Sequence, residues 1–281
     1  MKLTIDSFNR WENKSITLLG MSGVGKTHLS TILRRHDWFH FSGDYRIGTR
    51  HLDEPILDNI KQQAMRMPFL RDLLRSDSIY ISHNITVDNL EAVMSFIGKP
   101  GNPDKGGLSI KEFERRQELY RQGEIAAMKD VPDFMRKAQE IYGYQNFVND
   151  VGGSLCELED PEVIDILATH TLILYIQVTE ADEIELIKRS EADPKPLYYR
   201  PSFLEKELRS YMAEHKLARY EEIEPDDFTR WVFPRLFHAR IPRYESIAKP
   251  HGYTVSTTEI SGIRDDNDFL ELLDQAIRRS G

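Results

Sequence analysis

The chain has 281 residues, a formal net charge of −9 and a single cysteine. This acidic balance argues against a broad face for extended nucleic acid, which needs clustered Lys and Arg, and one cysteine excludes an internal disulfide. No stretch approaches the roughly 20 apolar residues of a membrane helix, and the first residues lack the basic start and apolar run of a signal peptide, so we expect a cytoplasmic globular protein with no membrane association.

Short apolar runs alternate with helical patterns, which is typical of a parallel sheet built from βαβ units. Residues 172–178 (LILYIQV) are nearly all apolar, as expected of a strand covered on both faces. Residues 78–82 (SIYIS) are left open as an additional strand. The five expected strands are residues 15–20, 38–41, 146–149, 172–178 and 253–257.

Helical patterns fill the segments between these strands. They follow the first strand at residues 28–35 and the fourth at residues 180–190, and a last one closes the chain at residues 269–279. Residues 202–250 also read mainly as helix. Residues 53–144 are mostly helical as well, and Ser109 with Glu112 forms a capping box that opens a long charged helix. We therefore divide the chain into a core, residues 1–52 and 145–281, and a helical insertion on the substrate side, residues 53–144.

Residues 20–27 read GMSGVGKT and match the pattern G-x-x-x-x-G-K-[ST]. The glycines let backbone N–H groups turn inward around phosphate oxygens, and the following helix points its partially positive N-terminus at the same place. Lys26 supplies a charge for the β- and γ-phosphates, and Thr27 offers a hydroxyl to Mg²⁺. The expected nucleotide contacts are Gly20, Ser22, Gly23, Val24, Gly25, Lys26, Thr27 and His28.

An aspartate follows the second strand in the segment FSGDYR, eighteen residues beyond Lys26. Because the ends of neighbouring parallel strands converge on one crevice, Asp44 is a candidate catalytic carboxylate that accepts the proton of an attacking hydroxyl. Arg46 and Arg50 follow, and bidentate bonds from them would hold an anionic substrate group. An ordinary turn aspartate and two surface arginines are the competing interpretation.

The segment FVNDVGG places Asp150 at the end of the third strand and Gly152 and Gly153 directly after it. A carboxylate at this point suits Mg²⁺, bound directly or through water. The two glycines permit close approach of a substrate to the backbone. An acidic turn without a ligand is the alternative.

A mobile lid is expected around residues 188–201, after the fourth strand and its helix. Closure of such a segment would bring Arg189 or Arg200 over the triphosphate, excluding water and adding positive charge where the transition state develops negative charge. A plain solvated loop is the competing interpretation of the same residues.

The order of these motifs resembles the group of shikimate kinases, gluconate kinases and adenylylsulfate kinases, over about half of the chain. GMSGVGKT is very similar to the gluconate kinase loop, FSGDYRIG resembles the D-G-D-N-x-R segment of adenylylsulfate kinases, and NDVGGS stands where shikimate kinases carry T-G-G-G. The resemblance implies a three-layer α/β P-loop NTPase fold with a five-stranded parallel sheet of order 2-3-1-4-5. It also implies ATP with Mg²⁺, Asp44 as the acceptor-side acid, Gly152 and Gly153 as substrate-side glycines, and Arg189 as a lid cation.

The chain departs from that group on the substrate side. The insertion is much longer than those small kinases contain, Ser154 replaces the third glycine, and the lid sequence PKPLYYRP matches no version in the group. The identity of the acceptor therefore does not carry over.

Three functions are compatible with these features. The first is an ATP-dependent phosphotransferase acting on a hydroxyl of a small, anionic metabolite, with plain ATPase activity as a fallback. The second is a nucleotide-switched regulatory ATPase whose insertion binds a protein partner; ATP is preferred over GTP because no N-K-x-D segment occurs. The third is a nucleotide or RNA-end kinase. Either a monomer or a homodimer fits the sequence.

Overall fold

The computed structural model describes residues 2–280, and its centre is one five-stranded, all-parallel sheet of order β2-β3-β1-β4-β5. With the glycine-rich turn between β1 and the first helix after it, this is the P-loop NTPase fold, as the resemblance implied. Each strand begins and ends within one residue of its expected range. The strands are β1 (Ser15–Leu19), β2 (Trp38–Ser42), β3 (Asn146–Asp150), β4 (Leu172–Gln177) and β5 (Gly252–Ser256).

Helices account for most of the remaining chain, including nearly all of residues 201–251. None of residues 78–82, which were left open as a strand, lies in a helix or strand. A π-helical turn, Ile47–His51, follows α3. The α-helices are α1 (Ile5–Arg10), α2 (Lys26–Arg34), α3 (Gly43–Arg46), α4 (Asp53–Ala64), α5 (Pro68–Arg75), α6 (Glu91–Ile97), α7 (Ile110–Lys129), α8 (Val131–Glu140), α9 (Pro161–His170), α10 (Glu180–Ala192), α11 (Pro201–Glu214), α12 (Pro225–His251), α13 (Thr257–Ser261) and α14 (Asp266–Ser280).

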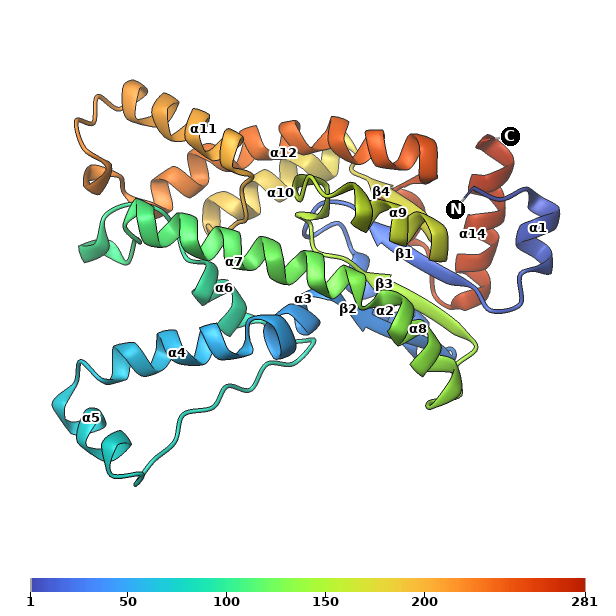
Figure 1. Cartoon of the computed structure of the whole chain (residues 1–281). Coiled ribbons are helices and arrows are strands. Elements are labelled where there is room, and N and C mark those ends of the chain that lie inside the picture. The colour runs from blue at the N-terminus through green and yellow to red at the C-terminus, as the bar shows by residue number, and fades with distance from the viewer. Residues whose placement is uncertain (1, 281) are drawn as a thin grey trace.

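The main core lies on the two faces of the sheet. Every residue of β1 is buried, and so are the first five of β4, which is the pattern of strands covered by helices on both sides. α2 and α8 pack against β2 and β3, whereas α12 packs against β4 and β5. Figure 1 shows α1 beside α14, close to both ends of the chain. No helix within residues 2–280 has the length and apolar character needed to cross a membrane.

Trp38, at the start of β2, anchors this core. Its side chain is fully buried, and its ring meets Phe269 of α14 edge-on, with the ring centroids 5.6 Å apart. Replacing Trp38 with alanine is expected to lower the free energy of unfolding by about 3–5 kcal/mol, because a large cavity is left in packed surroundings. Chemical denaturation measures this change, and Tyr80→Ala, at a side chain 88% exposed, serves as the control with an expected change within about 0.5 kcal/mol. Equal losses in both variants would contradict the packing described.

A second cluster of buried apolar residues lies beyond the sheet, between α7, α11 and α12. It contains Phe113, Tyr199, Phe203, Tyr211 and Phe228, and the tyrosine and phenylalanine rings pack against each other. This cluster holds α11 against α12 in the lobe at the upper left of Figure 1. The helical segments therefore bury a core of their own instead of relying only on the sheet.

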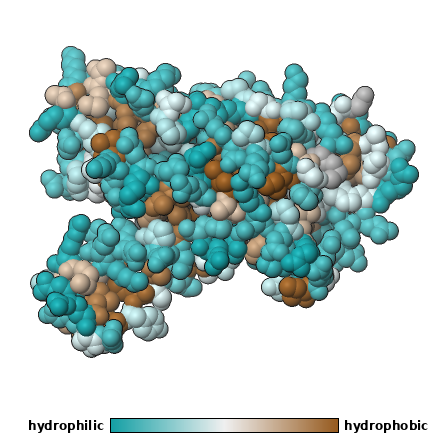
Figure 2. Space-filling view, in the orientation of Figure 1, coloured by the Kyte–Doolittle hydropathy of each residue, from teal (hydrophilic) through white to brown (hydrophobic). Residues whose placement is uncertain are grey.

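The first part of the insertion forms an arm that projects from the molecule, at the lower left of Figure 1. α4 leads outward, α5 lies at the tip without burying any residue, and residues 76–90 return in an irregular path. Phe69 and Tyr80 are 72% and 88% exposed. Figure 2 shows a notch between this arm and the lobe above it. It corresponds to a groove of about 950 Å³ lined by α4, the start of α7 and residues 103–109.

Candidate functional site

The carboxyl ends of β1, β3 and β2 lie side by side and place three sequence motifs at one edge of the sheet. The register pairs Leu18 of β1 with Asp150 of β3, and Asp150 in turn with Ser42 of β2. The phosphate loop directly follows β1, and Asp44 lies two residues after Ser42. Parallel pairing therefore brings together residues 20–27, Asp44 and Asp150, as the crevice rule for parallel sheets requires.

The loop of residues 20–27 has the backbone geometry that wraps an anion. Gly20, Gly23 and Gly25 all have positive φ angles, of 151°, 87° and 99°, which other residues rarely adopt. A side chain at Gly20 would also collide with the carbonyl oxygen of Ile176, since its Cβ would lie only 2.9 Å away. α2 begins at Lys26, so its N-terminal amides point into the loop.

Lys26 is almost completely buried beneath this loop. Its Nζ donates hydrogen bonds to the carbonyl oxygens of Gly20 and Met21, at 2.8 and 2.9 Å. An ammonium group has three N–H donors, so one remains for a phosphate oxygen. Burial lowers the pKa of Lys26, and the nearby carboxyl groups of Asp150 and Asp44 act in the opposite direction.

Thr27 and Asp150 are in direct contact. The hydroxyl of Thr27 donates to Oδ2 of Asp150 at 2.7 Å, and Nε2 of His40 lies 3.6 Å from the same oxygen. A hydroxyl and a carboxylate at the phosphate loop fit Mg²⁺, which binds one or two protein oxygens and completes its octahedron with water and phosphate. Within residues 2–280 no cluster of three or more His, Cys, Asp or Glu side chains forms a metal-binding group. The donor set thus suits a nucleotide-bound ion rather than a metal held by protein alone.

Asp44 lies at the start of α3 and faces the phosphate loop. Desolvation by the surrounding protein raises its pKa, and the charge of Asp150 raises it further, while Lys26 opposes both effects. The hydroxyl of Tyr120, on α7, donates to Oδ1 of Asp44 at 3.3 Å. A carboxylate with a raised pKa is a better proton acceptor, so this environment suits a general base.

Glu124, also on α7, is fully buried directly behind Asp44. Its Oε2 accepts a hydrogen bond from the hydroxyl of Ser154 at 2.6 Å, and its Oε1 has no hydrogen-bond partner among the described residues. Burial, together with the charge of Asp44, raises the pKa of Glu124 to about 8. Two carboxyl groups from different parts of the chain therefore lie near each other, and with a pKa of about 8 Glu124 carries a proton at neutral pH.

This raised pKa makes stability depend on pH. The folded protein keeps the Glu124 proton up to about pH 8, whereas the unfolded chain loses it near pH 4.5. The free energy of unfolding therefore falls as pH rises between these values, by at most about 1.4 kcal/mol per pH unit, and levels off above them. Glu124→Gln keeps an acceptor for Ser154 and removes this contribution.

Urea unfolding of both proteins between about pH 5 and pH 9 measures the effect, because titrating groups remote from Glu124 contribute to both curves and cancel in the difference. The variant is expected to gain stability relative to the natural chain as the pH rises. Parallel curves would show that Glu124 titrates normally in the folded protein.

Gly152 and Gly153 each lie where a side chain has no room. A Cβ at Gly152 would lie 2.8 Å from Oε1 of Glu124 and 3.1 Å from Oδ1 of Asp44. A Cβ at Gly153 would lie 2.7 Å from the backbone nitrogen of Ser22 in the phosphate loop. The glycine pair thus lets the segment after β3 pack closely against both the acids and the loop.

Arg46 and Arg50 were expected to hold an anionic acceptor. In the structure, Arg46 is paired with a carboxylate and Arg50 is exposed. Nε of Arg46 donates to Oδ2 of Asp130 at 2.7 Å, and its guanidinium lies over the ring of Phe134. His51 contacts the same Asp130 oxygen at 2.9 Å. Arg50 is exposed on the π-helical turn. Because the charge of Arg46 is already neutralised, the expectation of an anionic acceptor loses its main support.

Arg189, expected on a mobile lid, lies instead in the last turn of a helix. α10 continues to Ala192, so Arg189 lies within a helix, exposed and paired with Glu185 at 2.9 Å. It still borders the nucleotide region, because it lines a cavity of about 220 Å³ together with Gly23, Gly25 and His28. Val24, Leu29, Leu186 and Ile260 supply apolar walls to the same cavity.

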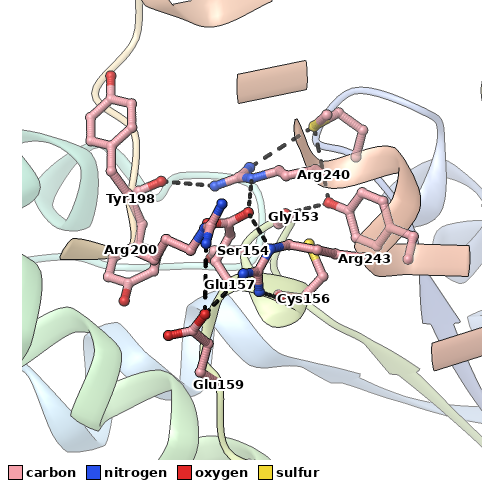
Figure 3. Close-up of polar contacts among 12 residues, drawn as sticks. Gly153, Ser154, Cys156, Glu157, Glu159, Tyr198, Arg200, Arg240 and Arg243 are labelled. Atoms are coloured by element: carbon pink, nitrogen blue, oxygen red, sulfur yellow. Dashed lines mark hydrogen bonds and ion pairs between the residues drawn. The ribbon is translucent and has the colours of Figure 1, made fainter. Parts of the chain in front are cut away.

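Arg200 belongs to a cluster of three arginines around two glutamates (Figure 3). Glu157 is fully buried and lies 3.1 Å from Nε of Arg200 and 3.9 Å from Nε of Arg240. Glu159, at the surface, accepts a hydrogen bond from Arg243 at 2.8 Å and lies 3.7 Å from Arg200. Ion pairs therefore hold Arg200, the expected second lid cation, against Glu157 and Glu159 in the segment that follows Gly153.

Arg240 connects this cluster to the phosphate loop. Its Nη2 donates to the carbonyl oxygen of Tyr198 at 2.8 Å, and its Nη1 lies 3.9 Å from the sulfur of Met21 (Figure 3). Tyr244, one turn further along α12, donates to the carbonyl oxygen of Gly153. α12 is thereby attached to both motifs that surround the acids.

Sequence reasoning missed Tyr120 and Glu124 because both lie in the insertion. A signal is nevertheless present in the spacing. The buried face of α7 includes polar positions at Arg116, Gln117 and Glu124, where an amphipathic helix usually has apolar residues. Polar residues on an inward helix face are satisfied by a buried partner or take part in a site.

No protein-family model matches the sequence, and no curated protein matches it either. Among solved structures, the chain is similar to a shikimate kinase from Bacteroides thetaiotaomicron, with 13% sequence identity and a TM-score of 0.45. The alignment covers 94% of this chain and 98% of that chain. This likeness is too remote to carry an argument about function, so the fold assignment rests on the strand order and on the loop geometry described above.

Proposed function

We propose that the protein transfers the γ-phosphoryl group of ATP to a hydroxyl of a small acceptor molecule. The observation that carries this proposal is the convergence of Lys26, Thr27, Asp150 and Asp44 at one edge of the sheet. A nucleotide-binding protein without transfer chemistry has no need of a partly desolvated carboxylate beside the phosphates. Asp44, with its raised pKa, supplies that group.

The nucleotide would lie across the phosphate loop. The loop amides and the ammonium of Lys26 would bind the β- and γ-phosphates, and the cavity lined by Val24, Leu186 and Ile260 would take the adenine. Thr27 and Asp150 would hold Mg²⁺, which neutralises phosphate charge when bound. Arg189 lines this cavity and would be the cation that acts on the triphosphate from the lid side.

In the transfer step, Asp44 accepts the proton of the acceptor hydroxyl as its oxygen bonds to the γ-phosphorus. The bond between the γ-phosphorus and the β–γ bridging oxygen breaks, and ADP leaves with that electron pair. The protonated Glu124 lies near Asp44 and adds no negative charge there at neutral pH. Gly152 packs against both carboxyl groups, and a side chain at this position would collide with them.

Incubation of the purified chain with ATP, Mg²⁺ and a metabolite extract tests the proposal. Mass spectrometry is expected to find a phosphorylated product, and the matching acceptor is expected to stimulate ADP release. ATP turnover that no extract fraction stimulates, with no phosphorylated product, would rule out a small-molecule kinase.

A regulatory ATPase remains the second candidate because of the arm formed by α4 and α5. α5 buries none of its residues, and the exposed Phe69 and Tyr80 offer apolar surface to a protein partner. Acceptor phosphorylation at full rate by the Phe69→Ser, Tyr80→Ser double variant would favour the kinase. A nucleotide-dependent change in the proteolytic cleavage of the arm, without any product, would favour the regulatory ATPase.

A further inference from the structure

A second cavity, of about 490 Å³, lies between α7 and α11, away from the phosphate loop. Its walls come from α7, from residues 198–201, from α11 and from Tyr220. None of its lining residues belongs to residues 20–27. The volume lies within the range of about 300–1,000 Å³ that is usual for small-molecule sites. Two lining residues that are neighbours in sequence, Tyr198 and Tyr199, belong to the main core and to the second apolar cluster, respectively.

The walls of this cavity are mainly apolar, and the polar groups of Gln117 and Tyr220 already have partners, whereas the buried hydroxyl of Tyr198 has none among the described residues. The side-chain amide of Gln117 bridges the backbone, donating to the carbonyl oxygen of Leu197 at 3.1 Å and accepting from the N–H of Tyr199 at 2.8 Å. The hydroxyl of Tyr220 donates to the carbonyl oxygen of Leu108 and accepts from the N–H of Gly101. These residues therefore offer a ligand aromatic and aliphatic surface. Further apolar wall comes from Ile110, Leu204, Leu208 and Met212.

The exposed charges at the cavity are mainly negative. Glu114, Glu118 and Glu205 line it, and the single cation that lines it, Arg209, is bound by Glu205 at 2.5 Å. Glu118 accepts a hydrogen bond from Gln122 at 2.8 Å and pairs with Arg121 at 3.7 Å, so among the described residues Glu114 is the carboxylate at the cavity that has no counter-charge. Glu114 makes no hydrogen bond or ion pair with any residue in the described range 2–280 and is exposed. An apolar cavity with an uncompensated carboxylate at its rim attracts a ligand that has an apolar body and a positive charge.

We propose that this cavity is a binding site for a small organic cation with an apolar or aromatic body, such as an aryl-alkyl ammonium compound. The body would lie against Leu204, Leu208 and the tyrosines, and the ammonium group would lie at the rim near Glu114. The proposal is independent of the phosphotransferase reaction, because it depends on a different cavity.

Three probes that share one aromatic body test the proposal on the full-length chain. Isothermal titration calorimetry at neutral pH is to compare phenethylammonium, phenethyl alcohol and phenylacetate. The cation is expected to bind about two- to fivefold more tightly than the alcohol, and the anion more weakly than either. Equal binding of the cation and the alcohol, preferential binding of the anion, or no binding at millimolar concentration would each overturn the proposal.

Two variants locate the binding. Glu114→Gln removes the rim charge at an exposed position and is expected to weaken cation binding about two- to fivefold without changing alcohol binding. Leu204→Trp fills the cavity and is expected to abolish binding of the cation and the alcohol, with thermal unfolding as the check on folding. Glu12→Gln, at an exposed position before β1, is the matched charge control. Equal cation affinity in Glu114→Gln and Glu12→Gln would place the cation elsewhere.

Discussion

Replacing Lys26 with alanine is expected to reduce nucleotide turnover by roughly 100- to 1,000-fold. The ammonium group is buried under the loop and is held 2.8 Å from the carbonyl oxygen of Gly20, so its charge is fixed close to the position of the phosphates. Alanine removes the charge where the transition state needs it. Steady-state ADP release and titration with a fluorescent ATP analogue measure turnover and binding separately.

Lys137→Ala is the control for this experiment. Lys137 is on α8, remote from the loop in sequence, and pairs with Asp133 at the surface. It is expected to leave turnover unchanged, because exposed ion pairs contribute little and this one does not face the site. Lys26→Arg provides a second variant that keeps the charge but not the compact shape. Full turnover in Lys26→Ala would remove the loop from the mechanism.

Replacing Asp44 with asparagine is expected to lower phosphoryl transfer by roughly 100- to 10,000-fold while nucleotide affinity changes little. Asparagine is nearly the same size and keeps an oxygen for the Tyr120 hydroxyl, but it cannot accept the acceptor's proton. The raised pKa of Asp44 adds a second readout. In the natural chain, transfer is expected to decline with falling pH already above the range of an ordinary aspartate.

Asp130→Asn is the matched control, because Asp130 pairs with Arg46 and His51 rather than facing the phosphate loop. Its rate of phosphoryl transfer, and the pH at which that rate declines on acidification, are expected to stay close to those of the natural chain. An Asp44→Asn protein that phosphorylates the acceptor at the natural rate would exclude Asp44 as the base. Another group would then have to accept the proton of the attacking hydroxyl.

The sheet could be predicted from sequence with little error. The strand expected at residues 172–178 ends one residue earlier, at Gln177, and the run at residues 78–82 is irregular despite its β-type composition. Ser78 and Tyr80 are exposed, so that run has neither a strand to pair with nor a core to cover. Local preference alone does not make a strand when tertiary pairing is missing.

The candidate site could be predicted only in part. Thr27 and Asp150, both expected to hold Mg²⁺, are 123 positions apart and still meet, because β1 and β3 are neighbours in a sheet whose order the family resemblance implied. Arg46 is paired with Asp130, 84 positions away in the insertion, and the sequence did not indicate this contact. Nothing local in the sequence distinguishes a free arginine from a paired one.

By itself, the sequence determined the phosphate loop, the five strands and the acid after β2. The loop depends on the conformational freedom of glycine, the strands on apolar runs within a few residues, and the acid on its position directly after a strand. Only the tertiary structure decided the charge state of Glu124, the ion pairs of Arg200 and the cavity between α7 and α11. A pKa, an ion pair and a cavity depend on which distant side chains exclude water from a group, and packing determines that.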